Sequence, residues 1–260
     1  MEIKIPAIQK EWKVPANQPP WKSQATAVIK KIKANYSGQM AKASQYTGVP
    51  VNILVAFAAT ESGGALNQTL NGPSKGIMQV NPSSAWQALS DQIKVDTIGR
   101  FYPLYQLAPN AFVVKKPVAA NSVGKATDYL TLKPVTTASA YLGQRMVADA
   151  QFAIYMGSLL LAQLIAGTIA KTGQIRLDHI IIKYNAGTGR FRQVVSSRGL
   201  ESASVDTTQL YNQLPIPVSQ AYIVKMMGIN GYLDVQIQTD EGDKTFRIEI
   251  ERVHMEEDTG

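Results

Sequence analysis

The amino-acid sequence predicts an α+β protein that is mainly α-helical, with an irregular insertion and a C-terminal β-hairpin. Apolar segments with helical periodicity recur along the chain, and residues 99–140 interrupt them with four prolines. Residues 234–260 instead alternate apolar and polar residues on both sides of DEGD, which is typical of a hairpin. The 260 residues are 45% hydrophobic and 17% charged, so the composition is that of a globular protein with a sizeable core.

The chain divides into three parts. Residues 1–22, rich in proline, predict an extended N-terminal arm, residues 23–233 predict the main helical domain with its insertion at 99–140, and residues 234–260 predict an acidic hairpin tail. The periodicity predicts helices at 23–47, 49–60, 82–98, 145–171, 174–185 and 217–232. Pro50 suits the first turn of the second of these helices.

Residues 150–170 are uncharged over 21 positions, which is long enough to cross a bilayer. They include four polar side chains, Gln151, Ser158, Gln163 and Thr168. No basic cluster or tryptophan belt flanks them. We therefore expect a buried core helix here and no transmembrane span, with a span as the alternative.

The net charge of +7 is unevenly distributed along the chain. Residues 1–233 hold 23 Lys and Arg against 10 Asp and Glu, whereas residues 234–260 hold 3 against 9. A basic body fits a polyanionic partner, and nucleic acid, anionic lipid and the bacterial wall all qualify. A basic surface that serves only solubility is the alternative.

The residue types present limit the chemistry. The sequence has no cysteine, and its two histidines are His179 and His254. Thiolate metal sites and cysteine nucleophiles are therefore excluded, and a Ser/His triad has few candidates. Chemistry must come from carboxylates, hydroxyls, amides and lysines, and we expect no metal and no organic cofactor.

Three short motifs carry candidate chemistry. Glu61, in FAATESGG, ends an apolar helix, where loss of solvent raises a carboxyl pKa and favours a proton donor near neutral pH; a solvated helix-end glutamate is the alternative. Residues 76–82, GIMQVNP, can bind a sugar amide or cap a helix. Residues 183–191, KYNAGTGRF, present Tyr184 and Asn185 before a glycine turn that would also serve as a helix C-cap.

Together and in this order, the motifs resemble those of the lytic transglycosylase family of the lysozyme-like superfamily. The Glu-Ser pair is Glu61 and Ser62, the G-[LI]-M-Q motif lies at residues 76–79, and the Y-N-A-G motif lies at residues 184–187. The interval of 18 residues from the acid to the glutamine of the second motif is also similar to that of the family. The resemblance covers about residues 40–233 and implies a lysozyme-like fold.

The resemblance implies a single-carboxylate mechanism on peptidoglycan glycan strands. Catalytic Glu61 would protonate the oxygen that links N-acetylmuramic acid to N-acetylglucosamine, and would then take the proton of the attacking C6 hydroxyl, which leaves a 1,6-anhydromuramic end. Gln79 and Tyr184 would hold the acetamido group and orient Glu61, while Asn185 fixes its loop. The substrate-binding residues implied are Ser62, Met78, Gln79, Tyr184 and Asn185.

Three other functions stay open. A hydrolytic muramidase on the same fold is the first alternative, a structural tail or secretion component with a decayed site is the second, and a nucleic-acid-binding module, which rests on charge alone, is the third. We expect no nucleic-acid partner.

The N-terminal sequence contains no apolar h-region of a signal peptide. We therefore expect a phage virion protein, in the tail or injection apparatus, that acts in the host periplasm or wall. An exported bacterial protein without its signal is the alternative. The N-terminal arm and the C-terminal hairpin are expected to contact virion or secretion-apparatus proteins, because an exposed strand edge readily pairs with a partner's sheet.

Overall fold

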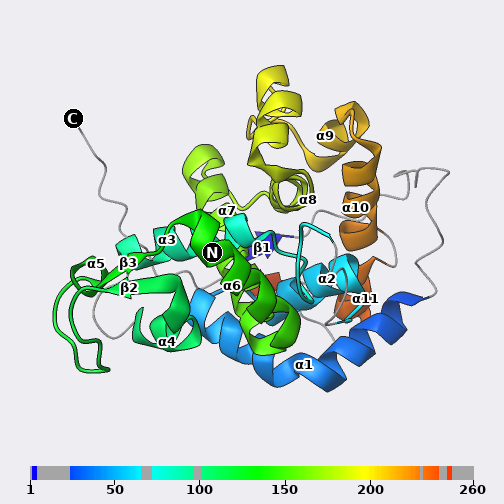
Figure 1. The fold of residues 1–260 in the computed structure, drawn as a ribbon. Coiled ribbons are helices and arrows are strands. Elements are labelled where there is room, and N and C mark those ends of the chain that lie inside the picture. The colour runs from blue at the N-terminus through cyan, green and yellow to red at the C-terminus, as the bar shows by residue number, and fades with distance from the viewer. Residues whose placement is uncertain are drawn as a thin grey trace.

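The computed structural model describes residues 2–4, 24–65, 72–95, 101–228, 231–239 and 245–247. This part of the chain is mostly helical with two small two-stranded antiparallel sheets, which confirms the α+β class (Figure 1). The helices are α1 (Ala25–Thr47), α2 (Val51–Ser62), α3 (Pro82–Val95), α4 (Phe101–Leu107), α5 (Ala126–Tyr129), α6 (Val135–Ala148), α7 (Ala150–Thr172), α8 (Leu177–Val194), α9 (Thr207–Gln213), α10 (Pro217–Met227) and α11 (Tyr232–Thr239). The strands are β1 (Glu2–Lys4), β2 (Phe112–Val114), β3 (Leu130–Leu132) and β4 (Thr245–Arg247), and short 3-10 turns lie at η2 (Pro109–Ala111) and η3 (Ser196–Arg198).

Helix α7 packs against α1, α2, α3, α6 and α8 and so joins the two sides of the molecule. Figure 1 shows α8, α9 and α10 along one side and the β2–β3 hairpin with α4 and α5 at the other. α7 is long and apolar enough to cross a membrane, and just over half of its most apolar stretch is buried inside the protein. Its assignment as the core helix of a soluble protein stays a prediction.

Helices α1 and α2 form where the sequence predicts them, and their ends are set by glycine and proline. α1 ends at Gly48, whose φ of 74° lets its N–H bond back to the Ser44 carbonyl at 2.8 Å. Pro50 precedes α2, and its carbonyl accepts from the amides of Ile53 and Leu54. Seven consecutive residues of α2, from Ile53 to Ala59, are buried. The last turn of α2 therefore lies against the core of the protein.

The predicted insertion is more regular than the sequence indicates. Its described part contains α4, α5 and a β2–β3 hairpin, in which Phe112 pairs with Leu132 and Val114 with Leu130, before α6 begins at Val135. The Trp86 indole on α3 donates to the Lys133 carbonyl at 2.8 Å, which fastens this segment to the helical body.

The predicted C-terminal hairpin is wrong. Tyr232–Thr239 is helix α11, and β4 pairs with β1 across the chain, with Glu2 opposite Arg247 and Lys4 opposite Thr245. A short alternating run cannot distinguish strand from helix by pattern alone. The alternation would expose Gln236, but this side chain is 1% exposed and donates to the carbonyls of Tyr232 and Asn52, both at 3.1 Å. The proposed DEGD turn and residues 5–22 of the arm lie outside the described residues.

Two helix boundaries also differ from the prediction. The helical region before the Y-N-A-G motif is broken at Asp149, which ends α6 and caps α7 by accepting from the Phe152 amide at 3.1 Å. The closing helix stops at Met227, and a separate helix, α11, begins at Tyr232.

Candidate active site

Glu61 lies in the last turn of α2, immediately before the helix ends at Gly63. Gly63 has a φ of 60°, and its N–H bonds to the Ala59 carbonyl at 3.2 Å. The Glu61 side chain is partly buried. The apolar helix and the glycine turn therefore hold one carboxyl group at the edge of the core, as the sequence predicts.

Tyr222 of α10 is the direct partner of Glu61. Its hydroxyl donates to Glu61 Oε1 at 2.6 Å. Burial raises the pKa of Glu61 from 4.5 to about 7, while the Tyr222 hydrogen bond and the charge of Lys225 both act to lower it. Glu61 is therefore poised to give and take a proton near neutral pH.

Tyr184 of α8 closes the other side of this site. Its hydroxyl donates to the Met78 carbonyl at 2.6 Å, and its ring centroid lies 4.8 Å from that of Phe57 on α2. The Phe57 ring also lies 6.3 Å from Tyr222. The pKa values of both tyrosines are raised, by burial first and then by the negative charge of Glu61, so their hydroxyls remain donors.

The G-I-M-Q segment forms a tight turn closed by a bridge between Lys75 and Val80. Gly76 has a φ of 72°, and a Cβ built there would lie 2.3 Å from the Met146 carbonyl oxygen, so only glycine fits. Gln79 has a φ of 48°, and its amide Nε2 donates to the Gly76 carbonyl at 2.7 Å. A left-handed non-glycine residue is costly, and such strain is often kept at functional sites.

The turn is seated against α7. Met78 is fully buried, and a Cβ at Gly157 of α7 would lie 2.6 Å from the Met78 side chain. Met78 therefore contributes its carbonyl to the site, through Tyr184, and its side chain to the core.

Two predicted substrate-binding residues serve the protein scaffold. The Ser62 hydroxyl, 4% exposed, donates to the Ala58 carbonyl at 3.1 Å and accepts from the Gly64 amide at 3.1 Å, so its donor is used to shape the helix end. Asn185 Oδ1 accepts from the buried Ser219 hydroxyl at 2.9 Å, which joins α8 to α10.

The structure thus brings Glu61, Tyr184 and the Met78 carbonyl together, with Gln79 on the same turn as Met78. Sequence reasoning missed Tyr222 and Lys225. The available signal was their spacing, because they are polar positions three residues apart in the otherwise apolar run AYIVKMM.

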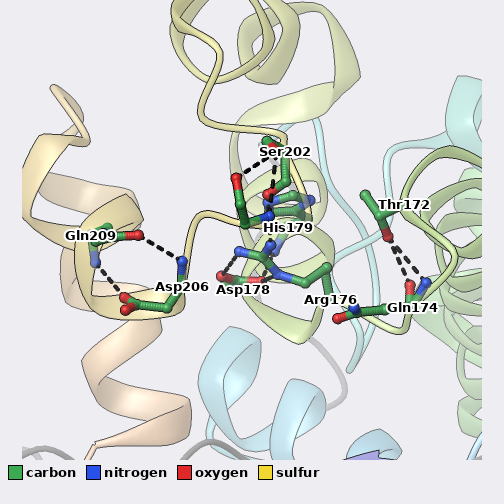
Figure 2. Close-up of polar contacts among 9 residues, drawn as sticks. Thr172, Gln174, Arg176, Asp178, His179, Ser202, Asp206 and Gln209 are labelled. Atoms are coloured by element: carbon green, nitrogen blue, oxygen red, sulfur yellow. Dashed lines mark hydrogen bonds and ion pairs between the residues drawn. The ribbon is translucent and has the colours of Figure 1, made fainter.

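A second polar cluster lies at the start of α8 (Figure 2). Arg176 makes a two-pronged contact to Asp178 at 3.1 and 2.8 Å and also donates to the Ser202 carbonyl at 3.2 Å. His179 is fully buried with its ring 5.2 Å from that of Phe191, and burial lowers its pKa to about 4. This cluster fastens α8 to the segment after η3. His254 lies outside the described residues.

In the part of the chain that the structure describes, no group of three or more His, Asp or Glu side chains is placed to hold a metal ion.

Comparisons with known proteins give short partial matches. No protein-family model matches this chain. The chain is 71% identical over 31 residues to an aspartyl/glutamyl-tRNA(Asn/Gln) amidotransferase subunit of Thermobifida fusca, which is 12% of this chain and 6% of that protein. It is 46% identical over 50 residues to the corresponding amidotransferase subunit of Streptomyces avermitilis, which is 19% of this chain and 9% of that protein. The chain therefore spans less than a tenth of the length of these curated relatives.

Proposed function

We propose that this protein is a peptidoglycan lytic transglycosylase with a lysozyme-like fold over residues 23–233. The observation that carries the proposal is Glu61, a carboxyl group at the end of an apolar helix, with a pKa of about 7 and a tyrosine hydroxyl bonded to it. The order and spacing of the three sequence motifs support the same activity. An acid that works alone suits this reaction, because the substrate itself supplies the nucleophile.

The proposed reaction moves one proton through Glu61. The protonated carboxyl group donates to the oxygen between N-acetylmuramic acid and N-acetylglucosamine as the bond from that oxygen to C1 breaks. The N-acetyl group stabilises the cationic centre at C1. The Glu61 carboxylate then accepts the proton of the C6 hydroxyl as its oxygen bonds to C1, which regenerates the acid and leaves a 1,6-anhydromuramic end.

The neighbours of Glu61 divide the remaining work. Tyr222 donates a hydrogen bond that stabilises the carboxylate present between the two proton transfers. Tyr184, held on the Met78 carbonyl, and Gln79 on the same turn form the wall on which we place the acetamido group. Ser62 shapes the end of α2 through its bond to the Ala58 carbonyl, and Asn185 joins α8 to α10 through Ser219, so both hold the helices that carry the site in place.

A hydrolytic muramidase on the same fold is the second candidate. Glycoside hydrolysis normally requires a second carboxylate to activate water or to act as nucleophile. Two of the other described acids, Asp149 and Asp178, are held by Arg145 and Arg176. The pKa of Glu61 is set by burial, by the Tyr222 hydroxyl and by the charge of Lys225, which favours the single-carboxylate mechanism.

The proposed setting is a phage virion, where the enzyme would act for the tail or injection apparatus on the host wall. An exported bacterial enzyme is the alternative. The support for partner contacts is the proline-rich segment of residues 1–22, with Trp12 and Trp21, and the acidic segment of residues 240–260. Helix α11 is excluded from this attachment role because it packs on α1, α2 and α10.

The proposal is tested by incubating the full chain with purified, dye-labelled sacculi. We expect release of soluble labelled fragments, with a rate that declines above about pH 7 as Glu61 loses its proton. Heat-denatured protein at the same concentration is the control. Absence of release at every pH from about 5 to 8 by folded protein would exclude wall-cleaving activity.

A further inference from the structure

Lys225 lies one helical turn beyond Tyr222 on α10 and is partly buried. Its Nζ donates to the carbonyl of Thr60 at 3.2 Å. The same ammonium group stands 5.8 Å from the centroid of the Tyr232 ring on α11, within cation–π range. A flexible lysine is thus held between the residue before Glu61 and an aromatic face.

The Thr60 carbonyl that Lys225 contacts lies at the negatively charged end of α2, next to Glu61. It belongs to the last turn of α2, where carbonyls lack helical partners and the helix carries partial negative charge. The negative charge of the helix end disfavours ionisation of Glu61, which lies in the same turn. The Lys225 ammonium group, bonded to the Thr60 carbonyl, offsets this effect.

Helix α11 supports the lysine from the far side. Besides placing Tyr232 under Lys225, α11 sends Gln236 to the carbonyl of Asn52 in the first turn of α2 at 3.1 Å. Helix α2 is therefore fixed at its start by α11 and at its end by Lys225.

We propose that Lys225 is a positioning residue for Glu61. The positive charge of Lys225 stabilises the carboxylate formed when Glu61 gives up its proton, and the hydrogen bond from Lys225 to Thr60 fixes the end of α2. This role rests on the proposed function, because a stabilised carboxylate matters only if Glu61 transfers a proton. It extends the site to α11, which reaches Glu61 through Lys225.

The groups that face Glu61 agree with this role. Tyr222 and Lys225 approach it from α10, and Tyr184 approaches from α8. Lys225 lowers the pKa of Glu61, and Glu61 in turn raises that of Lys225 against the effect of burial. Tyr232 is the titratable neighbour that α11 adds beneath the lysine.

The test separates the charge of Lys225 from its hydrogen bond. Lys225→Gln keeps an N–H donor for Thr60 but loses the charge, and Lys225→Arg keeps both. The pKa of Glu61 is measured on substrate-free full chain by carbon-13 NMR of labelled glutamate carboxyls, with Glu61→Gln identifying the resonance. Lys30→Gln, a charge loss on the exposed face of α1, is the matched control.

We expect Lys225→Gln to raise the pKa of Glu61 by about one unit or more, and Lys225→Arg and Lys30→Gln to leave it near 7. On sacculi, Lys225→Gln should cleave about tenfold more slowly at pH 6, with its alkaline limb moved to higher pH. An unchanged pKa in Lys225→Gln, or an equal rise in Lys225→Arg, would overturn the proposal. A shifted pKa in a protein whose parent cleaves no wall would instead count against the proposed function.

Discussion

Replacing Glu61 with glutamine is expected to slow the release of fragments from sacculi at least about 100-fold, with the fold preserved. The amide matches the carboxyl group in shape and can still accept the Tyr222 hydrogen bond through its oxygen. It cannot donate an acidic proton to the glycosidic oxygen or recover one. Initial rates of dye release at pH 6 and equal folded concentration measure the effect.

The matched control is Glu201→Gln, which removes a carboxylate that pairs with Lys183 at 3.8 Å and accepts from Ser196 at 2.6 Å. Wall cleavage by this variant should stay within about threefold of the parent, because the partners of its carboxylate are Lys183 and Ser196, not Glu61 or Tyr184. A loss below about tenfold in Glu61→Gln, or equal losses in both variants, would contradict the role of Glu61 as proton donor.

The raised pKa of Glu61 also predicts how the free energy of unfolding depends on pH in the parent and in Glu61→Gln. Between pH 4.5 and about 7 the unfolded chain loses the Glu61 proton while the folded protein keeps it. The free energy of unfolding of the parent therefore falls over this range relative to the variant, and the difference levels off above about pH 7. Urea unfolding at several pH values measures it, and a difference independent of pH would show that Glu61 has an ordinary pKa.

Removing helix α11 should have the largest effect on stability. Deletion of residues 232–260 exposes the pockets filled by Tyr232, Leu233 and Val235, which are 3%, 0% and 6% exposed. At about 1.5–3 kcal/mol for each buried apolar side chain, the loss from these three is roughly 4.5–9 kcal/mol. That is comparable with the whole stability of a typical domain, about 5–15 kcal/mol. We therefore expect this truncation to lose cooperative unfolding or to be insoluble.

The control for this truncation is a shorter deletion that leaves α11 in place. Deletion of residues 240–260 retains α11 and removes only β4 and the acidic segment, so circular dichroism should show an unfolding temperature within a few degrees of the full chain. It should also retain most wall cleavage while weakening incorporation into the parent assembly. If the longer deletion unfolds cooperatively at the same temperature as the full chain, α11 is not part of the core.

The helices around Glu61 could be predicted because their signals are local. Pro50 and Gly63 mark the ends of α2, and the apolar run between them indicates burial whatever the rest of the chain does. The rise in the pKa of Glu61 follows from that placement alone, because burial is its largest cause.

The remaining features depend on contacts between distant segments. The hydroxyl that binds Glu61 belongs to Tyr222, which lies 161 residues after it in the sequence. The spacing of Tyr222 and Lys225 in AYIVKMM marks two polar positions but does not indicate Glu61 as their partner. The alternation in YLDVQIQT predicts a strand, whereas the segment is a helix in which the buried Gln236 side chain bonds to the Asn52 carbonyl of α2. The family resemblance assigns Ser62 and Asn185 to substrate binding, whereas their partners, Ala58 and Ser219, are known only once the fold is built.

The chemistry of the new glycan ends tests the central claim most directly. The full chain is incubated with purified sacculi in oxygen-18 water, and the soluble fragments are analysed by mass spectrometry. The single-carboxylate mechanism predicts 1,6-anhydromuramic ends without oxygen-18, because the C6 hydroxyl and not water attacks C1. Reducing muramic ends that carry one oxygen-18 atom would contradict it and would identify the protein as a hydrolase.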